Sequence, residues 1–216
     1  MADKLANLER IRQCGIVPVI RAASAEEGIK IADAVVAGGV DVVEITMTVP
    51  RAIEVMAQIS KHYGSKVLLG AGTILDAETA RAAILAGADF VVGPNVNYDM
   101  IRLAKRYSKL VMPGALTPTE VVGAWEAGAD VVKIFPAGEI GGASYIKSLK
   151  GPLPHIEMMP TGGVDLTTAA DFIKAGCIAL GAGSALVDKK AVAAGKFEVV
   201  TENAGKFREI IKKARG

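Results

Sequence analysis

The sequence predicts an α/β fold, a (β/α)8 or TIM barrel, in a single domain that spans residues 1–216. Short apolar segments alternate with helix-like segments along the chain, and this alternation is typical of parallel strands connected by helices. Ala-Gly dipeptides recur where predicted helices end, and glycine-rich loops follow the last two predicted strands. Barrels of this class often bind phosphate at these two loops, so we favour the barrel over an open, doubly wound sheet.

Eight predicted strands are short, mostly β-branched or otherwise apolar, and lie near Gly or Pro. Such runs are typical of parallel strands that are buried on both faces. In chain order they are Ile16–Ile20, Val42–Thr46, Val67–Gly70, Phe90–Val92, Leu110–Met112, Val131–Phe135, Ile156–Met159 and Ile178–Leu180.

Helical spacing of apolar residues occurs between these strands, and the segment 188–216 is also helix-like and is expected to pack outside the barrel. Ser24 with Glu27 predicts a capping box, and Asp76 and Thr117 are typical N-caps. The predicted helices include Ala25–Ala37, Arg51–Tyr63, Ala77–Leu85, Pro118–Glu126 and Thr168–Lys174. Glycine favours the left-handed conformation after a helix, and the Ala-Gly dipeptides place it at Gly38, Gly87, Gly128 and Gly176.

The composition indicates a folded protein without a nucleic-acid surface. Hydrophobic residues make up 51% and charged residues 22% of the chain, and the formal net charge is +2. A nucleic-acid-binding domain would need a strongly basic face. Cys14 and Cys177 are far apart and show no metal-ligand spacing, and the N-terminal segment has no apolar signal core. We therefore expect reduced cysteines, a cytoplasmic location and no membrane partner.

Lys133 lies inside the apolar segment Val131–Phe135, where a charge is costly. Burial lowers the pKa of a lysine, and the neutral amine can then act as a nucleophile toward carbonyl groups. The alternative is a lysine at a strand end whose amine reaches water.

Glu44 lies in the same kind of segment, Val42–Thr46. Because side chains alternate along a strand, Glu44 shares a face with Thr46, as Lys133 does with Phe135. If both faces point into the barrel, an amine and a carboxyl group meet near its C-terminal end. Such a pair suits Schiff-base chemistry, which needs a nucleophile and a proton shuttle. The alternative is a structural buried ion pair.

Two glycine-rich loops, Thr161-Gly162-Gly163 and Gly181-Ala182-Gly183-Ser184, follow the last two predicted strands. Their backbone N–H groups could bind an anion, and the alternative is ordinary tight turns. Neither loop matches the dinucleotide-binding pattern.

Further polar and rigid residues end the earlier strands. Arg21 could hold a carboxylate through two hydrogen bonds, or it could form a surface ion pair. Thr73 ends the third predicted strand and would face the same end of the barrel, while Pro94 and Pro113 favour rigid turns. His62 and His155 show no ligand spacing, so we expect no metal.

In these segments the chain resembles, over nearly its whole length, the bacterial KDPG (2-keto-3-deoxy-6-phosphogluconate) and KHG (4-hydroxy-2-oxoglutarate) aldolases. These are class I aldolases with a barrel fold. The residues that carry the resemblance are Val17-Pro18-Val19-Ile20-Arg21, Val43-Glu44-Ile45-Thr46, Gly70-Ala71-Gly72-Thr73, Met112-Pro113-Gly114, Lys133-Ile134-Phe135-Pro136, Pro160-Thr161-Gly162-Gly163 and Gly181-Ala182-Gly183-Ser184.

The resemblance implies that Lys133 forms the Schiff base and that Glu44 is the general acid and base. It implies cleavage of the phosphorylated keto acid to pyruvate and glyceraldehyde 3-phosphate, with KHG as a second substrate, and a homotrimer without metal or cofactor. The expected substrate-binding residues are Arg21, Thr73, Pro94, Pro113, Phe135 and Thr161, and the expected phosphate-binding residues are Gly162, Gly163, Gly183 and Ser184.

Two departures from the family pattern leave the substrate preference open. Some members carry an arginine shortly after the glutamate, where this chain has Met47, Thr48 and Val49; others, like this chain, carry it on the first strand, at Arg21. Gly93 replaces a serine that often precedes Pro94. The alternatives are a phosphosugar epimerase or isomerase, a pyridoxal-phosphate barrel and a non-catalytic trimeric binding module.

Overall fold

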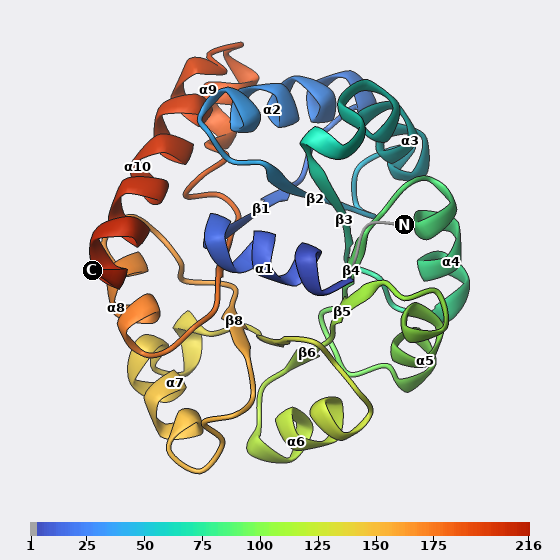
Figure 1. The fold of residues 1–216 in the computed structure, drawn as a ribbon. Helices are drawn as coiled ribbons and strands as arrows, with labels where there is room; N and C mark the ends of the chain where they lie inside the picture. Colours follow the sequence, from blue (N-terminus) through green and yellow to red (C-terminus); the bar gives the residue numbers. More distant parts are fainter. Residues whose placement is uncertain (1–3) are drawn as a thin grey trace.

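A computed structural model describes residues 4–216 and shows an α/β fold with a curled parallel sheet surrounded by helices (Figure 1). Residues 1–3 of the expected domain lie outside this range. In the described chain the strands are β1 Ile16–Ile20, β2 Val42–Thr46, β3 Leu68–Gly72, β4 Phe90–Val92, β5 Leu110–Met112, β6 Gly114–Ala115, β7 Val132–Ile134, β8 Met158–Pro160 and β9 Leu180–Ala182.

The strands pair in two parallel groups. One sheet has the order β5-β4-β3-β2-β1-β9 and the other has the order β6-β7-β8. A parallel bridge between Thr161 and Gly181 joins the end of the smaller sheet to β9. Buried Pro113 separates β5 from β6, and its carbonyl accepts a hydrogen bond from the backbone N–H of Lys133. The predicted α/β class is thus confirmed.

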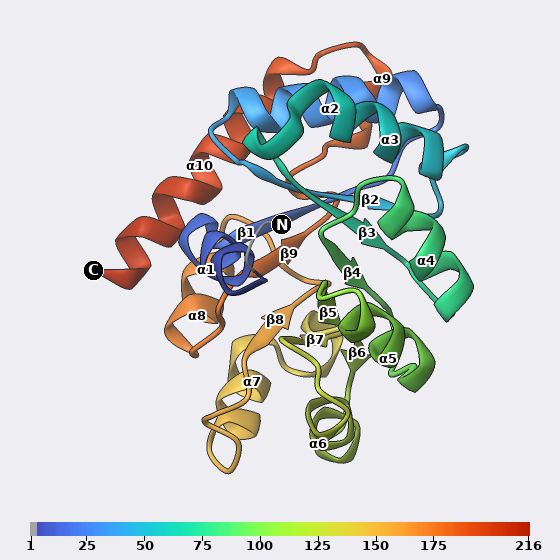
Figure 2. The same cartoon turned by 45° about the vertical axis from the view of Figure 1, so that its right-hand side comes forward.

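The helices are α1 Lys4–Cys14, α2 Ala25–Ala37, α3 Ala52–Tyr63, α4 Ala77–Leu85, α5 Tyr98–Arg106, α6 Pro118–Glu126, α7 Gly142–Lys150, α8 Ala169–Lys174, α9 Lys189–Ala193 and α10 Glu198–Arg215. Helices α2 and α3 cover one side of the curled sheet, and α6 and α7 lie on the opposite side (Figure 2).

The predicted N-caps are observed, but the capping box expected at Ser24 and Glu27 is incomplete, because the Glu27 carboxylate accepts from the backbone N–H of Ala23 and not from that of Ser24. The side chains of Ser24, Asp76 and Thr117 each accept a backbone hydrogen bond at the N-terminus of their helix. Gly38 was expected to be left-handed, but its φ is −78° and Gly39 instead has a φ of +81°. Gly38 packs against α10, where a Cβ would lie 2.5 Å from the carbonyl oxygen of Thr201. Close packing, and not backbone conformation, therefore explains the glycine at position 38.

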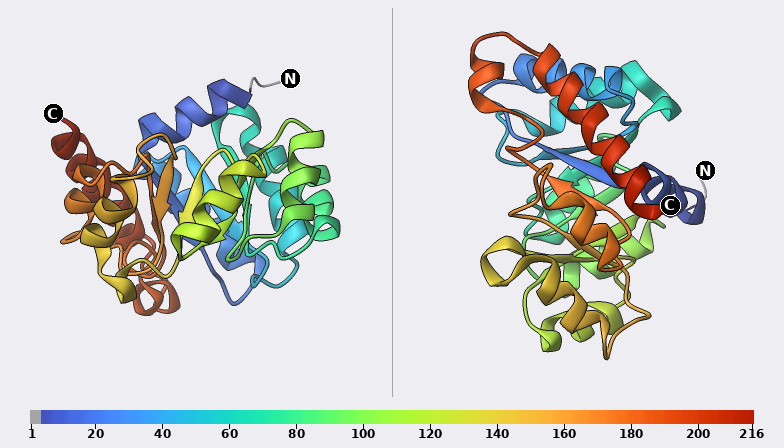
Figure 3. Two further views of the ribbon diagram at one scale, coloured as in Figure 1. Left: turned by 90° about the horizontal axis from the view of Figure 1, so that it is seen from below. Right: turned by 90° about the vertical axis from the view of Figure 1, so that its left-hand side faces the viewer.

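Helix α1 lies across the amino-terminal ends of the strands (Figures 1 and 3). Ion pairs hold it to residues that lie one or two positions before strands. Lys4 pairs with Asp130 before β7, at 2.8 Å, and Arg10 pairs with Asp41 before β2, at 2.7 Å. This end of the sheet is therefore covered, and a ligand would enter from the opposite end, where the strands end in loops.

Helix α10 packs on the outside and binds the end of α1 (Figure 3). The Arg208 guanidinium donates to the carbonyl oxygens of Gln13 and Cys14, and Arg215 donates to that of Arg12. The last carbonyl groups of a helix lack partners within it, so α10 satisfies those of α1.

Among residues 4–216, no helix has both the length and the apolar character needed to cross a membrane.

We expect Arg208→Ala to lower the free energy of unfolding by about 1–2 kcal/mol, because two hydrogen bonds are lost. Urea unfolding measures this change. Arg102→Ala is the matched control, since Arg102 is exposed on α5 and, among residues 4–216, pairs only with Asp99, a type of contact worth less than about 1 kcal/mol. Equal losses in the two variants would contradict the role given to Arg208.

Candidate active site

Lys133 lies in the middle of β7 and is only 6% exposed. Its Nζ lies 4.9 Å from the centre of the Phe135 ring, and it forms no hydrogen bond or ion pair with any residue from 4 to 216. Burial lowers the pKa of Lys133; Glu44 opposes this shift and Arg21 adds to it. The amine is therefore buried, contrary to the alternative of a lysine that reaches water, and its neutral form is favoured.

Glu44 lies in β2 and is 1% exposed. Its Oε2 atom has no hydrogen-bond partner within the described chain. Burial raises the pKa of Glu44, against the opposing effects of Lys133 and Arg21. Glu44 and Lys133 are close enough to affect each other's pKa, but they form no ion pair. The alternative of a structural buried ion pair is therefore wrong.

The two shifts have chemical consequences. A lysine with a lowered pKa can supply a neutral nucleophile, and a carboxyl group with a raised pKa can hold and release a proton near neutral pH.

In the part of the chain described, Glu44 Oε2 and Thr161 Oγ1 are the buried side-chain oxygens without a partner. Buried polar atoms are rarely left unpaired, so a bound molecule or water would complete both.

The glycine-rich loops lie where the last strands end. Gly162 and Gly163 have φ values of +84° and +70°, a conformation that glycine adopts without strain. Gly138 donates to the carbonyl oxygen of Gly162, which fixes this loop to the one after β7. In the other loop the carbonyl of Gly183 accepts two hydrogen bonds, and exposed Ser184 makes none within residues 4–216. Ser184 is thus available to a ligand.

Arg21 is exposed and makes no ion pair with any described residue, so the alternative of a surface ion pair is wrong. Its Nη1 lies 3.8 Å from where a Cβ on Gly183 would be. Arg21 therefore lies beside the second glycine-rich loop, and its charge also reaches Glu44 and Lys133. Thr73 has a φ of +61°, a strained conformation for a β-branched residue that costs about 1–3 kcal/mol and often marks a functional site.

The remaining predicted residues differ in their relation to Lys133. Phe135 places its ring beside the amine, and Pro113 accepts the backbone hydrogen bond of Lys133. Pro94 instead packs against β6, because a Cβ on Gly114 would lie 2.3 Å from the Pro94 carbonyl oxygen. The role of Pro94 in substrate binding stays a prediction.

A cavity of about 360 Å³ lies beside Arg21 and includes two residues that the sequence did not single out. Thr48 follows β2, and its Oγ1 lies 2.6 Å from that of Thr46. Lys189 is the first residue of α9. Thr48 could have been predicted from the two threonines, Thr46 and Thr48, at the end of a strand. No local sequence pattern indicates a role for Lys189.

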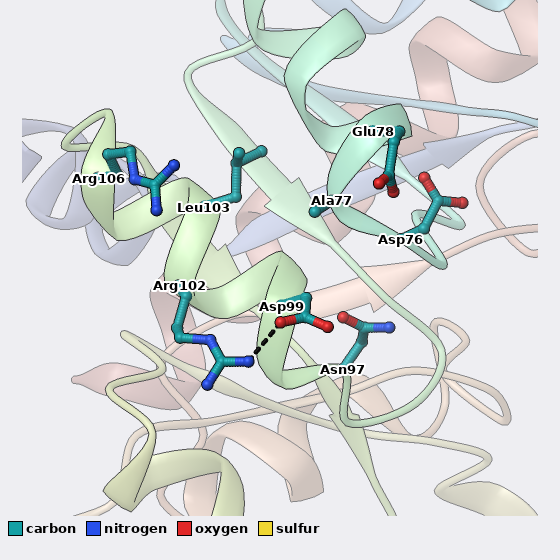
Figure 4. Close-up of a pocket in the computed structure, with 8 residues that line it drawn as sticks. All are labelled: Asp76, Ala77, Glu78, Asn97, Asp99, Arg102, Leu103 and Arg106. Atoms are coloured by element: carbon teal, nitrogen blue, oxygen red, sulfur yellow. Dashed lines mark hydrogen bonds and ion pairs between the residues drawn. The ribbon is translucent and has the colours of Figure 1, made fainter.

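A second hollow, of about 320 Å³, lies between α4 and α5, and its lining residues come from these helices and their caps (Figure 4). Four of its polar side chains already have partners. Asp76 and Asn97 cap α4 and α5, and Asp99 pairs with Arg102. We assign it no ligand. In residues 4–216, no cluster of three or more His, Cys, Asp or Glu side chains could hold a metal ion.

Comparison with known proteins identifies the family. The family model described as KDPG and KHG aldolase matches residues 8–203. A 2-dehydro-3-deoxy-phosphogluconate aldolase of Treponema pallidum is 34% identical over 94% of this chain and 95% of its own. A 2-dehydro-3-deoxy-6-phosphogalactonate aldolase of Escherichia coli is 38% identical over 79% of this chain and 83% of its own. A solved structure described as native KDPGal superimposes with a TM-score of 0.86 at 35% identity, covering 93% of this chain and 95% of that one. The chain therefore belongs to the KDPG and KHG aldolase family of lyases.

Proposed function

We propose that Lys133 is the Schiff-base lysine of this aldolase and that Glu44 is its general acid and base. The observation that carries the proposal is a 6% exposed lysine with no hydrogen bond or ion pair in the described chain, next to a fully buried carboxyl group that also lacks a partner. A structural role would normally pair such groups. Left unpaired, they remain free to react with a substrate.

In the first stage the neutral amine of Lys133 attacks the C2 ketone of a 2-keto-3-deoxy sugar acid phosphate. Glu44, acting through a water molecule, gives a proton to the carbinolamine oxygen, which leaves as water, and a protonated imine remains. The raised pKa of Glu44 supports this step, because burial shifts the carboxyl group toward its protonated form, which can donate a proton.

In the second stage Glu44 takes the proton of the C4 hydroxyl, and the C3–C4 bond breaks. Its electron pair moves to C3 and into the iminium, which gives an enamine, and glyceraldehyde 3-phosphate leaves. Protonation of the enamine at C3 and hydrolysis of the imine then release pyruvate and the free amine of Lys133.

The substrate is assigned from two groups of residues, one suited to a phosphate and the other to a keto acid. The loops that carry Gly162, Gly163, Gly183 and Ser184 suit a phosphate, and Arg21, next to Gly183, adds a positive charge. Thr73 and Thr161 serve the keto-acid portion. The named relatives act on gluconate and galactonate derivatives, which differ in stereochemistry, and KHG, cleaved to pyruvate and glyoxylate, is the unphosphorylated candidate.

We also propose that residues 1–216 form one domain with a closed (β/α)8 barrel, a cytoplasmic homotrimer that needs no cofactor. Only Pro113 separates β5 from β6, and the bridge between Thr161 and Gly181 spans the other junction. Exposed Leu75 and Tyr98, at 54% and 53%, are candidates for a subunit contact. Family membership does not support the epimerase or isomerase, the pyridoxal-phosphate barrel or the non-catalytic module.

The first test is reduction with borohydride in the presence of pyruvate, followed by peptide mass mapping. We expect a reduced pyruvyl adduct on Lys133 in the parent and none in Lys133→Arg, which should also lose turnover because guanidinium stays charged. Lys174→Arg, on α8, is the matched control and should behave like the parent. An adduct elsewhere, or substantial cleavage by Lys133→Arg, would refute the assignment.

Glu44→Gln should slow cleavage by about two to four orders of magnitude, because proton transfer is lost. The variant should also change the pH dependence of adduct formation. Lys133 must be neutral to react, so the rate in the parent should reach half its maximum below pH 10.5. Removing the Glu44 charge, which raises the pKa of Lys133, should move this midpoint to lower pH. A shift to higher pH would show that the two groups are not coupled in this way.

Lys133→Met should be more stable than the parent at pH 7. The pKa of Lys133 is lower in the folded protein than its ordinary value of 10.5, so the unfolded chain binds a proton more readily. This penalty is full below the folded pKa and disappears as the pH rises above 10.5. Urea unfolding from pH 7 to pH 10.5 should therefore show the gap between the two proteins narrowing. A variant less stable than the parent at pH 7 would contradict the expectation.

A further inference from the structure

Two glycines lie against Glu44 and Thr161, the buried side chains whose oxygens lack a hydrogen-bond partner in the described part of the chain. A Cβ on Gly72 would lie 1.8 Å from Glu44 Oε1 and 2.5 Å from its Cδ. A Cβ on Gly181 would lie 2.2 Å from Thr161 Oγ1. Real Cβ atoms essentially never approach another heavy atom closer than 3.0 Å. Neither position can therefore accept a larger residue unless the polar group moves.

The strand register produces both contacts. In the pairing of β2 with β3, Glu44 lies opposite Gly70 and Thr46 lies opposite Gly72. Gly72 thus lies closer than Glu44 to the end of the sheet where the strands end in loops. The carboxyl group of Glu44 occupies the space that a side chain on Gly72 would fill. The bridge between Thr161 and Gly181 brings the second pair together.

The Glu44 carboxyl group occupies the space that a side chain on Gly72 would need. It makes no hydrogen bond within residues 4–216, so no directional interaction with the described chain determines where its oxygens lie. We propose that Gly72 and Gly181 are positioning residues, whose missing side chains hold open the places occupied by the Glu44 carboxyl and the Thr161 hydroxyl. The part of the proposal that concerns turnover rests on the function proposed for Glu44.

Gly70 provides a matched control on the same strand and the same face. A Cβ there would lie 2.1 Å from atoms of the Phe90 ring, so Gly70 makes room for an apolar side chain. Strand β3 therefore contains two glycines with different neighbours, and only Gly72 faces a polar group of the site.

Stability measurements test the contact without relying on activity. We expect Gly72→Ala to destabilise the protein in urea unfolding, and Glu44→Ala to relieve most of that loss in the double variant. Gly70→Ala should lose the same amount in the parent and in the Glu44→Ala background. If Gly72→Ala alone does not fold, the double variant should still fold. An equal cost of Gly72→Ala in both backgrounds, or a double variant that fails to fold, would overturn the proposal.

Turnover provides the second measurement. Gly72→Ala should lower kcat for cleavage by about 10²- to 10⁴-fold, the range for losing a general acid or base. In the Glu44→Ala background the same change should alter the residual rate less than about twofold, because residues that act together are not additive. A similar fold-loss in both backgrounds would show that Gly72 acts only on structure. A parent and a Glu44→Ala variant with equal rates would instead refute the function proposed for Glu44 and leave the stability result to decide the contact.

The second pair can be tested in the same way. Gly181→Ala should destabilise the parent, and Thr161→Ala, which removes Oγ1, should relieve the loss. Thr161→Val keeps an atom in that place and should give no relief. Relief by both changes, or by neither, would overturn the assignment of Gly181.

Discussion

The burial of an amine and a carboxyl group side by side, without direct contact, is the constraint on which the rest of the site depends. Moving either charge out of water is costly, and a contact ion pair would recover part of that cost. Lys133 and Glu44 do not form one. Because the two groups are buried without pairing, burial lowers the pKa of Lys133 and raises the pKa of Glu44. Each group is thus moved toward the neutral form, which allows the amine to attack a ketone and the acid to deliver a proton.

Such a site needs rigid walls, because unpaired polar groups tend to move toward water or toward each other. The parallel ladder provides the walls. The backbone of Lys133 is held by Pro113 on one side and paired with Met159 on the other, and α1 covers the amino-terminal ends of the strands. Two arginines of α10 anchor α1 through its last carbonyl groups. Interactions far from Lys133 thus hold in place the helix that covers this end of the sheet.

The sequence predicted the elements whose signals are local. Ala25–Ala37, Ala77–Leu85 and Pro118–Glu126 have the predicted bounds, because capping residues mark where each begins. Helices α1, α5 and α7 were missed. In α1, for example, only Asn7, Ile11 and Cys14 are buried, and this spacing gives a weak apolar pattern in a strongly charged segment.

The last two predicted strands were placed too early in the chain. Apolar residues that precede each paired strand are already buried, as Ile156 and Ile178 are. Burial alone therefore does not show at which residue the strand pairing begins. The same limit applies to the site. Lys133 and Glu44 were visible in the sequence because a charge interrupts an apolar run. The absence of an ion pair between them depends on three-dimensional packing, which no local pattern records.

The glycines show most clearly which features of the site could not be predicted from the sequence. Gly162 and Gly163 could be recognised, because a glycine pair after a strand predicts a tight loop, and their positive φ values confirm such a backbone. Gly72 and Gly181 lie within strands and have no unusual backbone conformation. These glycines matter because the space that their side chains would need is occupied by the Glu44 carboxyl and the Thr161 hydroxyl. A hydrogen bond to either group would hold it equally well, but it would also stabilise one protonation state or occupy the atom that a substrate must contact. Positioning by shape alone, as proposed, leaves the carboxyl and the hydroxyl without hydrogen bonds in residues 4–216, and glycines lie beside Glu44 Oε1 and Thr161 Oγ1.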